Sequence, residues 1–362
     1  MSSEVPFSVT DMSVLSTAPL EPGALPPAPV PPAPFGRVAT AMVTPFRPDG
    51  GLDLDGAAAL AAHLVDAGND ALVINGTTGE APTTSDAEKR ELLRAVVGAV
   101  GDRARVVAGV GTNDTAHTVS LARDAERAGA HGLLVVSPYY SKPPQAGLVA
   151  HFTAVADAAE LPVMIYDIPG RAGVAVSTET LVRLAEHPRV VAVKDAKDDL
   201  AASSWVLART DLAYYAGTDA LTLPLLAVGG VGVVSVVSHI ATPVVRAMVD
   251  AHFAGYSARA LAAHRRLLPA IEALFRTQAA ILAKAVLRMA GLPAGPVRLP
   301  LVDAGEGELA QLRADLAAAG LLAGLDELDE AAGPPAAGRV SAGSGVSAGA
   351  GVSAASGLGV AR

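Results

Sequence analysis

Short apolar runs rich in β-branched residues alternate along the chain with longer stretches in which apolar residues recur at helical spacing. This alternation is typical of a parallel sheet whose strands are joined by crossover helices. Eight strand–helix units of this kind predict a (β/α)8 barrel, an α/β fold. The eight predicted strands are residues 38–43, 71–75, 106–109, 132–136, 163–167, 190–194, 213–216 and 232–236.

One of the intervening helices carries a complete start signal. Ser85 is followed by Glu88 three positions later, which is the spacing of a capping box, and apolar residues between 92 and 100 fall on one helical face. A doubly wound open sheet is the main alternative fold. That fold carries a Gly-rich dinucleotide fingerprint after its first strand, whereas this chain has Thr44-Pro45-Phe46 there, so the barrel is preferred.

The pattern changes at both ends of the chain. Residues 1–35 are Pro-rich and residues 326–362 are rich in Gly, Ser and Ala, so we expect two disordered tails. Residues 36–255 hold the predicted catalytic barrel, and residues 256–325 a small C-terminal domain with three predicted helices. An apolar face is expected on the first of these helices, formed by Leu261, Leu267, Leu268, Ile271, Leu274 and Phe275. It could pack on the barrel or on a neighbouring subunit.

Charge and composition exclude several classes of function. The net charge is −9 and the charged residues are scattered, so no basic stripe suggests nucleic acid or an anionic membrane as a partner. The sequence has no long uninterrupted apolar stretch and no signal-peptide pattern, so we expect no transmembrane helix and a cytoplasmic location. The chain has no cysteine, which excludes disulfides and cysteine nucleophiles. The dispersed histidines show no ligand spacing, so no metal is expected.

Lys194 ends the apolar run 190–193, and an ammonium group at a buried strand end is costly unless its amine is used. The chain has only five lysines among its 27 Lys and Arg residues. A lysine can form a Schiff base, and an arginine cannot. Taken alone, Lys194 also fits a lysine whose stem packs while its head reaches water.

Residues at the ends of other strands decide between these interpretations, because active sites of such barrels collect at the C-terminal ends of the strands. The second strand runs into Gly76-Thr77-Thr78-Gly79-Glu80, whose amides and hydroxyls suit a small carboxylate. The fourth runs into Pro138-Tyr139-Tyr140, and the fifth ends at Tyr166 with Arg171 in its loop. Each motif alone also fits a turn or packing. Together around one lysine they indicate carbonyl chemistry on charged substrates.

These motifs, together with Gly217-Thr218-Asp219-Ala220, resemble the pyruvate-dependent class I aldolase superfamily and, within it, the dihydrodipicolinate synthase family, over about residues 36–322. The resemblance implies a lyase of lysine (diaminopimelate) biosynthesis that needs no cofactor. It implies that Lys194 forms an imine with pyruvate, and that the derived enamine adds to L-aspartate 4-semialdehyde.

The resemblance also assigns roles to residues. It implies a catalytic set made of Lys194, Tyr166, Thr77 and Tyr140. It implies a substrate-binding set made of Thr78, Arg171, Gly217, Val234 and Gly76, in which Arg171 binds the carboxylate of the aldehyde. Tyr140 is expected to act from a neighbouring subunit, so the resemblance implies a homotetramer, a dimer of dimers.

Two alternative functions stay open at this stage. One is a sister pyruvate-dependent aldolase acting on another aldehyde, and the other is a non-catalytic relative that binds an oxoacid. The chain also departs from the family pattern at Asp167 and Asp195, which are mild changes. At the allosteric lysine site known in some relatives, His117 occupies a position that is usually acidic. We therefore predict weak or absent feedback inhibition by lysine.

Overall fold

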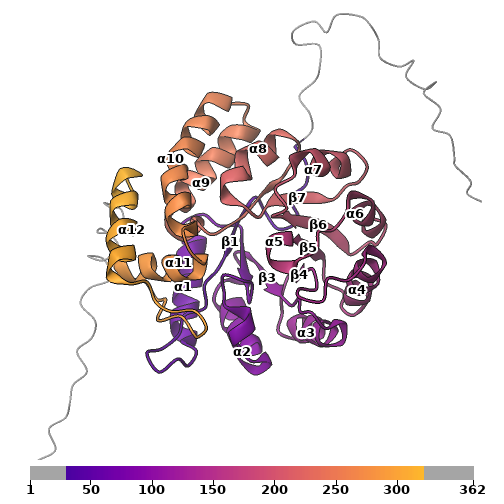
Figure 1. Cartoon of the computed structure of the whole chain (residues 1–362), viewed down its shortest axis with the longest axis horizontal. Helices are drawn as coiled ribbons and strands as arrows, with labels where there is room; N and C mark the ends of the chain where they lie inside the picture. Colours follow the sequence, from indigo (N-terminus) through magenta and orange to yellow (C-terminus); the bar gives the residue numbers. More distant parts are fainter. Residues whose placement is uncertain (1–29, 322–362) are drawn as a thin grey trace, which may run out of the picture.

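The computed structural model of the protein describes residues 30–321, and within them eight parallel strands close into a barrel (Figure 1). The barrel closes where β1 pairs with β8, with Val38 opposite Val233 and Thr40 opposite Ser235. The strands are β1 (Val38–Ala41), β2 (Ala71–Ile74), β3 (Arg105–Gly109), β4 (Gly132–Val136), β5 (Val163–Asp167), β6 (Val190–Asp195), β7 (Ala213–Ala216) and β8 (Gly232–Ser235). The predicted barrel is confirmed.

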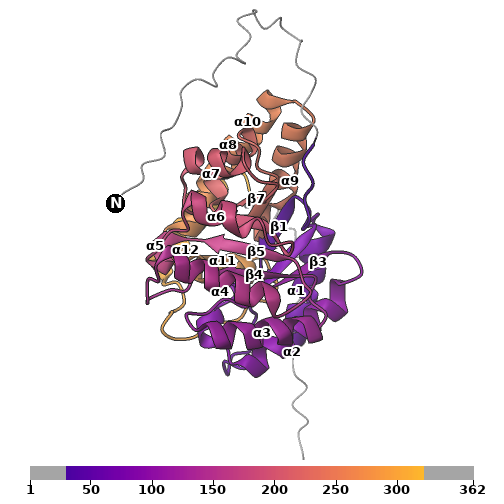
Figure 2. The same ribbon diagram turned by 90° about the vertical axis from the view of Figure 1, so that its right-hand side faces the viewer.

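Helices surround the barrel, and Figure 2, which shows it from the side, places α2 and α3 opposite α8 and α10. The helices of the barrel are α1 (Leu54–Asp66), α2 (Asp86–Val100), α3 (Thr115–Arg127), α4 (Gln145–Asp157), α5 (Pro169–Ala172), α6 (Thr178–Leu184), α7 (Leu200–Leu207), α8 (Thr222–Ala227) and α9 (Ser238–Phe253). The predicted capping box forms at α2: the Ser85 hydroxyl accepts from the Glu88 amide, and the Glu88 carboxylate accepts from the Ser85 amide.

Two apolar cores result from the alternation of side chains along the strands. One lies between the strands and the outer helices and includes Leu72, Val106 and Leu133. The other fills the barrel interior and includes Met164 and Tyr215.

Phe35 closes the N-terminal end of the barrel. Its side chain is only 1% exposed, its amide donates to the Tyr215 hydroxyl over 3.1 Å, and its ring packs against that of Tyr215. Gly132 leaves the room for it, since a Cβ there would lie 2.4 Å from the Phe35 ring. Ordered packing therefore begins just before the predicted barrel boundary at residue 36. Residues 1–29 and 326–362 of the expected tails lie outside the described residues.

Three further helices follow the barrel: α10 (Ser257–Phe275), α11 (Ala279–Met289) and α12 (Glu306–Ala318). Helix α10 packs on α9 and on α12, and Figure 1 shows this group at one side of the barrel. Of the expected apolar face on α10, Leu267, Ile271 and Leu274 are buried. Its other members, Leu261, Leu268 and Phe275, lie seven residues apart on an adjoining stripe that the neighbouring helices do not cover, and each is at least 40% exposed. Packing of this stripe on a neighbouring subunit stays a prediction.

Candidate active site

Lys194 lies at the C-terminal end of β6, between Tyr166 of β5 and Tyr215 of β7 in strand register. Its side chain is buried, and burial lowers the pKa of its ammonium to about 8, helped by the charge of Arg171 and opposed by that of Asp219. An amine with this pKa is about one-tenth neutral at pH 7, against about one part in three thousand for an ordinary lysine. The site therefore contains an amine that can act as a nucleophile near neutral pH.

Asp219 supplies the negative charge that opposes the effect of burial on Lys194. It is almost fully buried, and its carboxylate accepts hydrogen bonds from the Ser235 hydroxyl and the Val236 amide. Burial raises the pKa of Asp219, while these donors and the charge of Lys194 lower it. The sequence reasoning quoted Asp219 within a motif but gave it no role. The signal that could have found it is a carboxylate at the end of the strand next to the lysine.

Tyr166 is the penultimate residue of β5 and presents its ring to Lys194, whose Nζ lies 4.3 Å from the ring centroid. Burial raises the pKa of the Tyr166 phenol to about 12, and this effect is opposed by the charge of Arg171 and the hydroxyl of Thr77. The phenol is therefore protonated at neutral pH and can donate a proton or a hydrogen bond. Arg171 belongs to α5, the single turn that follows β5, and its side chain is exposed.

The loop after β2 carries Thr77 and Thr78. Asn75 and Glu80, which flank the loop, both adopt left-handed backbone conformations, with φ of 61° and 55°. The Thr44 hydroxyl donates to the Gly79 carbonyl over 2.7 Å, which ties the loop to the end of β1. Thr78 is buried and Thr77 is partly exposed.

The fourth strand leads to Tyr139 and Tyr140, as the sequence indicated. Tyr139 is partly exposed, whereas the Tyr140 side chain is 87% exposed and its φ is 73°. A tyrosine with so much exposed surface buries little area within its own chain, so contacts inside the subunit do not fix its ring.

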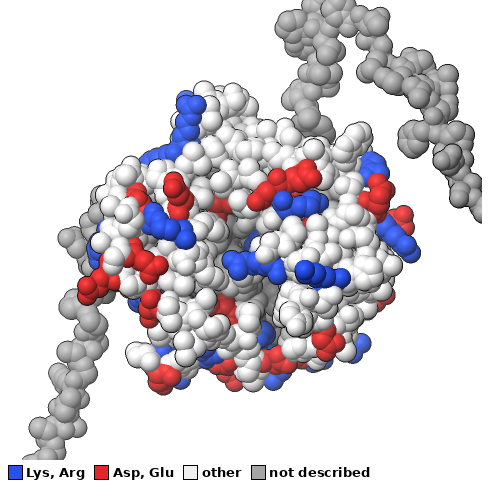
Figure 3. Space-filling model, in the orientation of Figure 1, with Lys and Arg blue, Asp and Glu red and all other residues white. Residues whose placement is uncertain are grey.

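A cavity of about 510 Å³ opens beside these residues. Its walls include five of the predicted site residues, which are Gly76, Thr77, Tyr140, Tyr166 and Arg171. The face of the molecule in Figure 3 is hollowed near its centre, with basic side chains at the edge of the hollow. The structure thus brings a phenol, a hydroxyl and a guanidinium to one concave surface, which suits a small anionic ligand.

The other predicted residues lie behind this surface. Lys194 is covered by Tyr166, and Gly217 leaves room for the lysine stem, since a Cβ on Gly217 would lie 3.1 Å from Lys194 Cγ. Val234 lies in the same interior core as Tyr166. All nine predicted residues therefore belong to the C-terminal half of the barrel interior, to its loops or to the cavity wall.

A partly buried ion pair lies near the site and was not predicted from the sequence. Lys197 Nζ lies 3.4 Å from Asp167 Oδ2, which joins the loop after β6 to the end of β5. Burial raises the pKa of the Asp167 carboxyl to about 6, opposed by the charge of Lys197. Sequence reasoning had noted Asp167 only as a departure from the family pattern.

Residues 30–321 contain neither a candidate metal site nor a candidate membrane-spanning helix. No group of three or more His, Asp or Glu side chains in this range is arranged to hold a metal ion. None of the helices in this range combines the length and the apolar character that crossing a membrane requires.

A parallel eight-stranded barrel with a buried low-pKa lysine at a strand end, beside a phenol and an open cavity, is the architecture of a Schiff-base-forming class I aldolase. Comparison with known proteins gives the family: the model of the dihydrodipicolinate synthetase family matches residues 34–319. The chain belongs to this family, and the resemblance inferred from its motifs is confirmed.

Two curated relatives show how similar the chain is to known members. It is 67% identical to 4-hydroxy-tetrahydrodipicolinate synthase 2 of Streptomyces coelicolor over 79% of this chain and 96% of the relative. It is 69% identical to 4-hydroxy-tetrahydrodipicolinate synthase of Acidothermus cellulolyticus, over 79% of this chain and 93% of the relative. Among solved structures, the dihydrodipicolinate synthase of Cyanidioschyzon merolae with lysine bound matches with a TM-score of 0.78 and 46% identity, over 80% of this chain and 99% of that one.

Proposed function

We propose that this protein condenses pyruvate with L-aspartate 4-semialdehyde, the reaction of a 4-hydroxy-tetrahydrodipicolinate synthase, and that it does so without a cofactor. The single observation that carries the proposal is the buried amine of Lys194, with a pKa of about 8, against the ring of Tyr166. The high identity to relatives of that name supports the choice of substrates within the family.

The proposed reaction begins with attack of the neutral Lys194 amine on the ketone carbon of pyruvate. The carbinolamine loses its hydroxyl as water, with a proton from the Tyr166 phenol, and leaves an imine. Loss of a methyl proton gives the enamine, whose carbon attacks the aldehyde carbon of the second substrate. The amine of that substrate then attacks the imine carbon, closes the ring and releases Lys194. Thr77 is proposed to relay the proton of the phenol, and its hydroxyl, which lowers the pKa of Tyr166, supports this role.

The proposed binding sites follow from the same geometry. Thr78 and the backbone at Gly76 and Gly217 are proposed to hold the pyruvate carboxylate and the imine, with Val234 on the apolar side of that pocket. Support comes from Gly217, which lies against the Lys194 stem. Arg171 is proposed to bind the carboxylate of the aldehyde, because it is a cation on the cavity wall above Lys194.

Assembly is a further part of the proposal. We propose a homotetramer built from dimers, in which Tyr140 completes the proton relay of a second subunit. The exposed Tyr140 ring supports this, since a tyrosine at the edge of a cavity gains by burial against a partner. The cytoplasmic location stays a prediction from the sequence.

The test is intact-mass spectrometry after borohydride reduction in the presence of pyruvate, followed by peptide mapping. The expected result is one adduct on Lys194, absent from Lys194→Ala and retained in Lys197→Ala, a matched variant of the other lysine near the site. A steady-state assay with L-aspartate 4-semialdehyde then tests the second substrate. A wild type without an adduct would overturn the Schiff-base mechanism. An adduct without turnover of this aldehyde would point to a sister aldolase or an oxoacid-binding protein.

A further inference from the structure

A buried ion pair connects the C-terminal helices to the catalytic loop. Lys284 in α11 places its Nζ 2.6 Å from Oε1 of Glu80, the residue that ends the Gly76–Glu80 loop, and the two side chains are 0% and 1% exposed. Two charges buried in this way are costly to hold unless each is fully paired. The pair lies outside the reacting groups described above, and the proposed chemistry does not use it.

The other bonds of the pair also tie the loop to the C-terminal segment. The second oxygen of Glu80, Oε2, accepts a hydrogen bond of 2.8 Å from the backbone amide of Arg298. Lys284 Nζ donates a second bond of 2.8 Å, to the carbonyl of Pro296. Both oxygens of Glu80 are therefore held by residues from 284 to 298, a segment more than two hundred positions away in sequence.

The backbone of Glu80 has a conformation that is uncommon for a residue other than glycine. Its φ of 55° and ψ of 38° lie in the left-handed region, which a residue with a Cβ adopts only when its surroundings impose it. A tightly held side chain can impose this conformation. The ion pair is thus placed to fix the direction in which the chain leaves Thr78 and Gly79.

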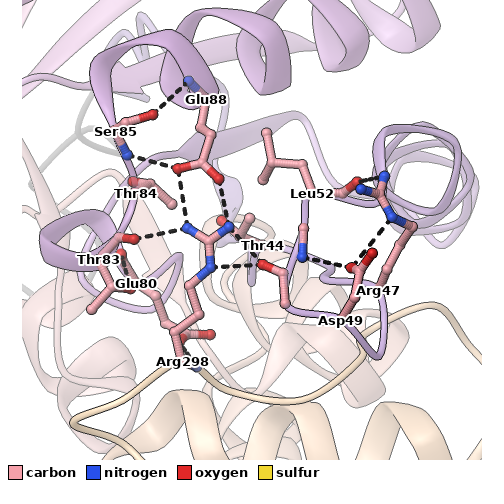
Figure 4. Close-up of polar contacts among 12 residues, drawn as sticks. Thr44, Arg47, Asp49, Leu52, Glu80, Thr83, Thr84, Ser85, Glu88 and Arg298 are labelled. Carbon is pink, nitrogen blue, oxygen red and sulfur yellow. Dashed lines mark hydrogen bonds and ion pairs between the residues drawn. The ribbon is translucent and has the colours of Figure 1, made fainter.

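The side chain of Arg298 makes further hydrogen bonds to neighbouring loops, as Figure 4 shows. Its guanidinium donates to the carbonyl of Gly50 in the loop after β1, to the carbonyl of Thr83 in the loop after β2, and to the carboxylate of Glu88 in the first turn of α2. Phe46 lies against both cations, with Lys284 Nζ and Arg298 Cζ each 4.1 Å from its ring centroid. The segment after α11 therefore binds the loops after β1 and β2 and the first turn of α2.

We propose that Glu80, held by Lys284, is a positioning residue of the active site, which fixes the loop so that Thr77 and Thr78 face Tyr166 and Lys194. Neither Glu80 nor Lys284 touches the reacting atoms. Their effect passes through two residues of backbone to Thr78 and three to Thr77. The proposal rests on the proposed function, because it assumes that this loop binds pyruvate.

The test compares Lys284→Met and Glu80→Gln with the wild type. Lys284→Met keeps a long apolar stem and removes the charge, while Glu80→Gln keeps the shape and an acceptor for the Arg298 amide. Arg276→Met is the matched control, because the Arg276–Asp315 pair links α10 to α12 and does not contact the loop. For each protein we would measure the melting temperature, the pyruvate concentration that half-saturates borohydride trapping, and KM for both substrates.

We expect Lys284→Met and Glu80→Gln each to raise the half-saturating pyruvate concentration at least tenfold and to change KM for the aldehyde by less than about threefold. The double variant is expected to be no worse than either single variant, because breaking the pair once already releases the loop. Arg276→Met is expected to lower the melting temperature without changing the response to pyruvate.

Two outcomes would overturn the positioning role. The first is wild-type pyruvate saturation in a folded Lys284→Met or Glu80→Gln variant, and Glu80→Gln decides alone if Lys284→Met does not fold. The second is a rise in the half-saturating pyruvate concentration of Arg276→Met equal to that of Lys284→Met at the same drop in melting temperature, which would mean that the Glu80–Lys284 pair is purely structural. A wild type that traps no pyruvate would instead overturn the proposed function, so the two failures are distinguishable.

Discussion

Lys194 faces the ring of Tyr166, its partner in strand register, with Nζ 4.3 Å from the ring centroid. A cation over an aromatic face is stabilised by about 0.5–2 kcal/mol, more when it is desolvated. Burial lowers the pKa of Lys194 to about 8, and the charge of Asp219 opposes this effect while that of Arg171 adds to it. The ring contact also favours the ammonium form, so changing any one of these three neighbours should change the reactivity of the lysine.

The first prediction concerns pH. Because the reactive form is the neutral amine and the pKa of Lys194 is about 8, the rate of imine formation should rise about tenfold per pH unit below that value and level off above it. The measurement is the initial rate of pyruvate trapping by cyanoborohydride across about pH 6–9, with Lys194→Ala as the blank. A rate that still rises about tenfold per pH unit at the upper end of this range would mean that the amine has an ordinary lysine pKa.

The second prediction concerns Tyr166→Phe, which removes the phenol hydroxyl and keeps the ring. We expect kcat to fall about 10²- to 10³-fold, because a proton donor for the departing hydroxyl is lost. The free energy of unfolding should change little, since the ring still packs against Lys194. Steady-state kinetics and a urea titration measure the two quantities. Tyr214→Phe, which removes another buried hydroxyl, from β7 on the other side of β6, serves as the control. Equal decreases of kcat in Tyr166→Phe and Tyr214→Phe would count against a role for the Tyr166 phenol in proton transfer.

The third prediction concerns Asp219→Asn. Losing the carboxylate charge removes an interaction that raises the pKa of Lys194, so the pH profile of imine formation should move to lower pH. The variant should also lose about 1–3 kcal/mol of unfolding free energy, because the donors at Ser235 and Val236 lose a charged acceptor. The profile is measured as for the wild type, with the exposed Asp211→Asn as control. An unchanged profile in Asp219→Asn would show that the two groups are not coupled.

The fourth prediction concerns Arg171. Replacement by Ala should raise KM for the aldehyde at least tenfold, since a charge-assisted contact to its carboxylate is lost. Arg171→Lys should have a KM for the aldehyde between those of the wild type and Arg171→Ala, because an ammonium cannot form the bidentate contact of a guanidinium. Arg171 also lowers the pKa of Lys194, so pyruvate trapping is compared at high pH, where the amine is mostly neutral in both proteins. A selective loss of pyruvate trapping there would place Arg171 at the pyruvate site instead.

The barrel could be predicted from the sequence because parallel strands buried on both faces must be short apolar runs, and each predicted run overlaps an observed strand. The residues at the strand ends followed directly, since strand direction fixes where Lys194 and Tyr166 lie. The Glu80–Lys284 pair could not be predicted, because local sequence patterns carry no information on contacts between residues so far apart in sequence. In the sequence, Lys284 is simply a cation within an Ala-rich helix. Phe35 was placed in a tail for a similar reason, since its partner Tyr215 lies 180 positions away.

The fifth prediction concerns feedback by L-lysine. The cavity wall away from Lys194 includes Asn113, His117, Asp86 and Lys89. The carboxylate of Asp86 is already paired with His117 Nε2 over 2.9 Å, and Lys89 adds a positive charge beside it. The ammonium groups of a bound lysine would meet like charge and no free carboxylate there.

We therefore expect inhibition by L-lysine to be weak or absent in a steady-state assay at saturating pyruvate. His117→Glu restores an acidic group at this position and should increase the sensitivity to lysine, while leaving the uninhibited rate close to that of the wild type, because His117 contacts none of the proposed catalytic groups. Asp114→Glu, a charge-preserving change at an exposed helix cap of α3, is the control. Sub-millimolar inhibition of the wild type would mean that Asp86 releases His117 and binds the ligand instead. If His117→Glu is no more sensitive to L-lysine than the wild type, the charge at this position does not determine inhibition by lysine.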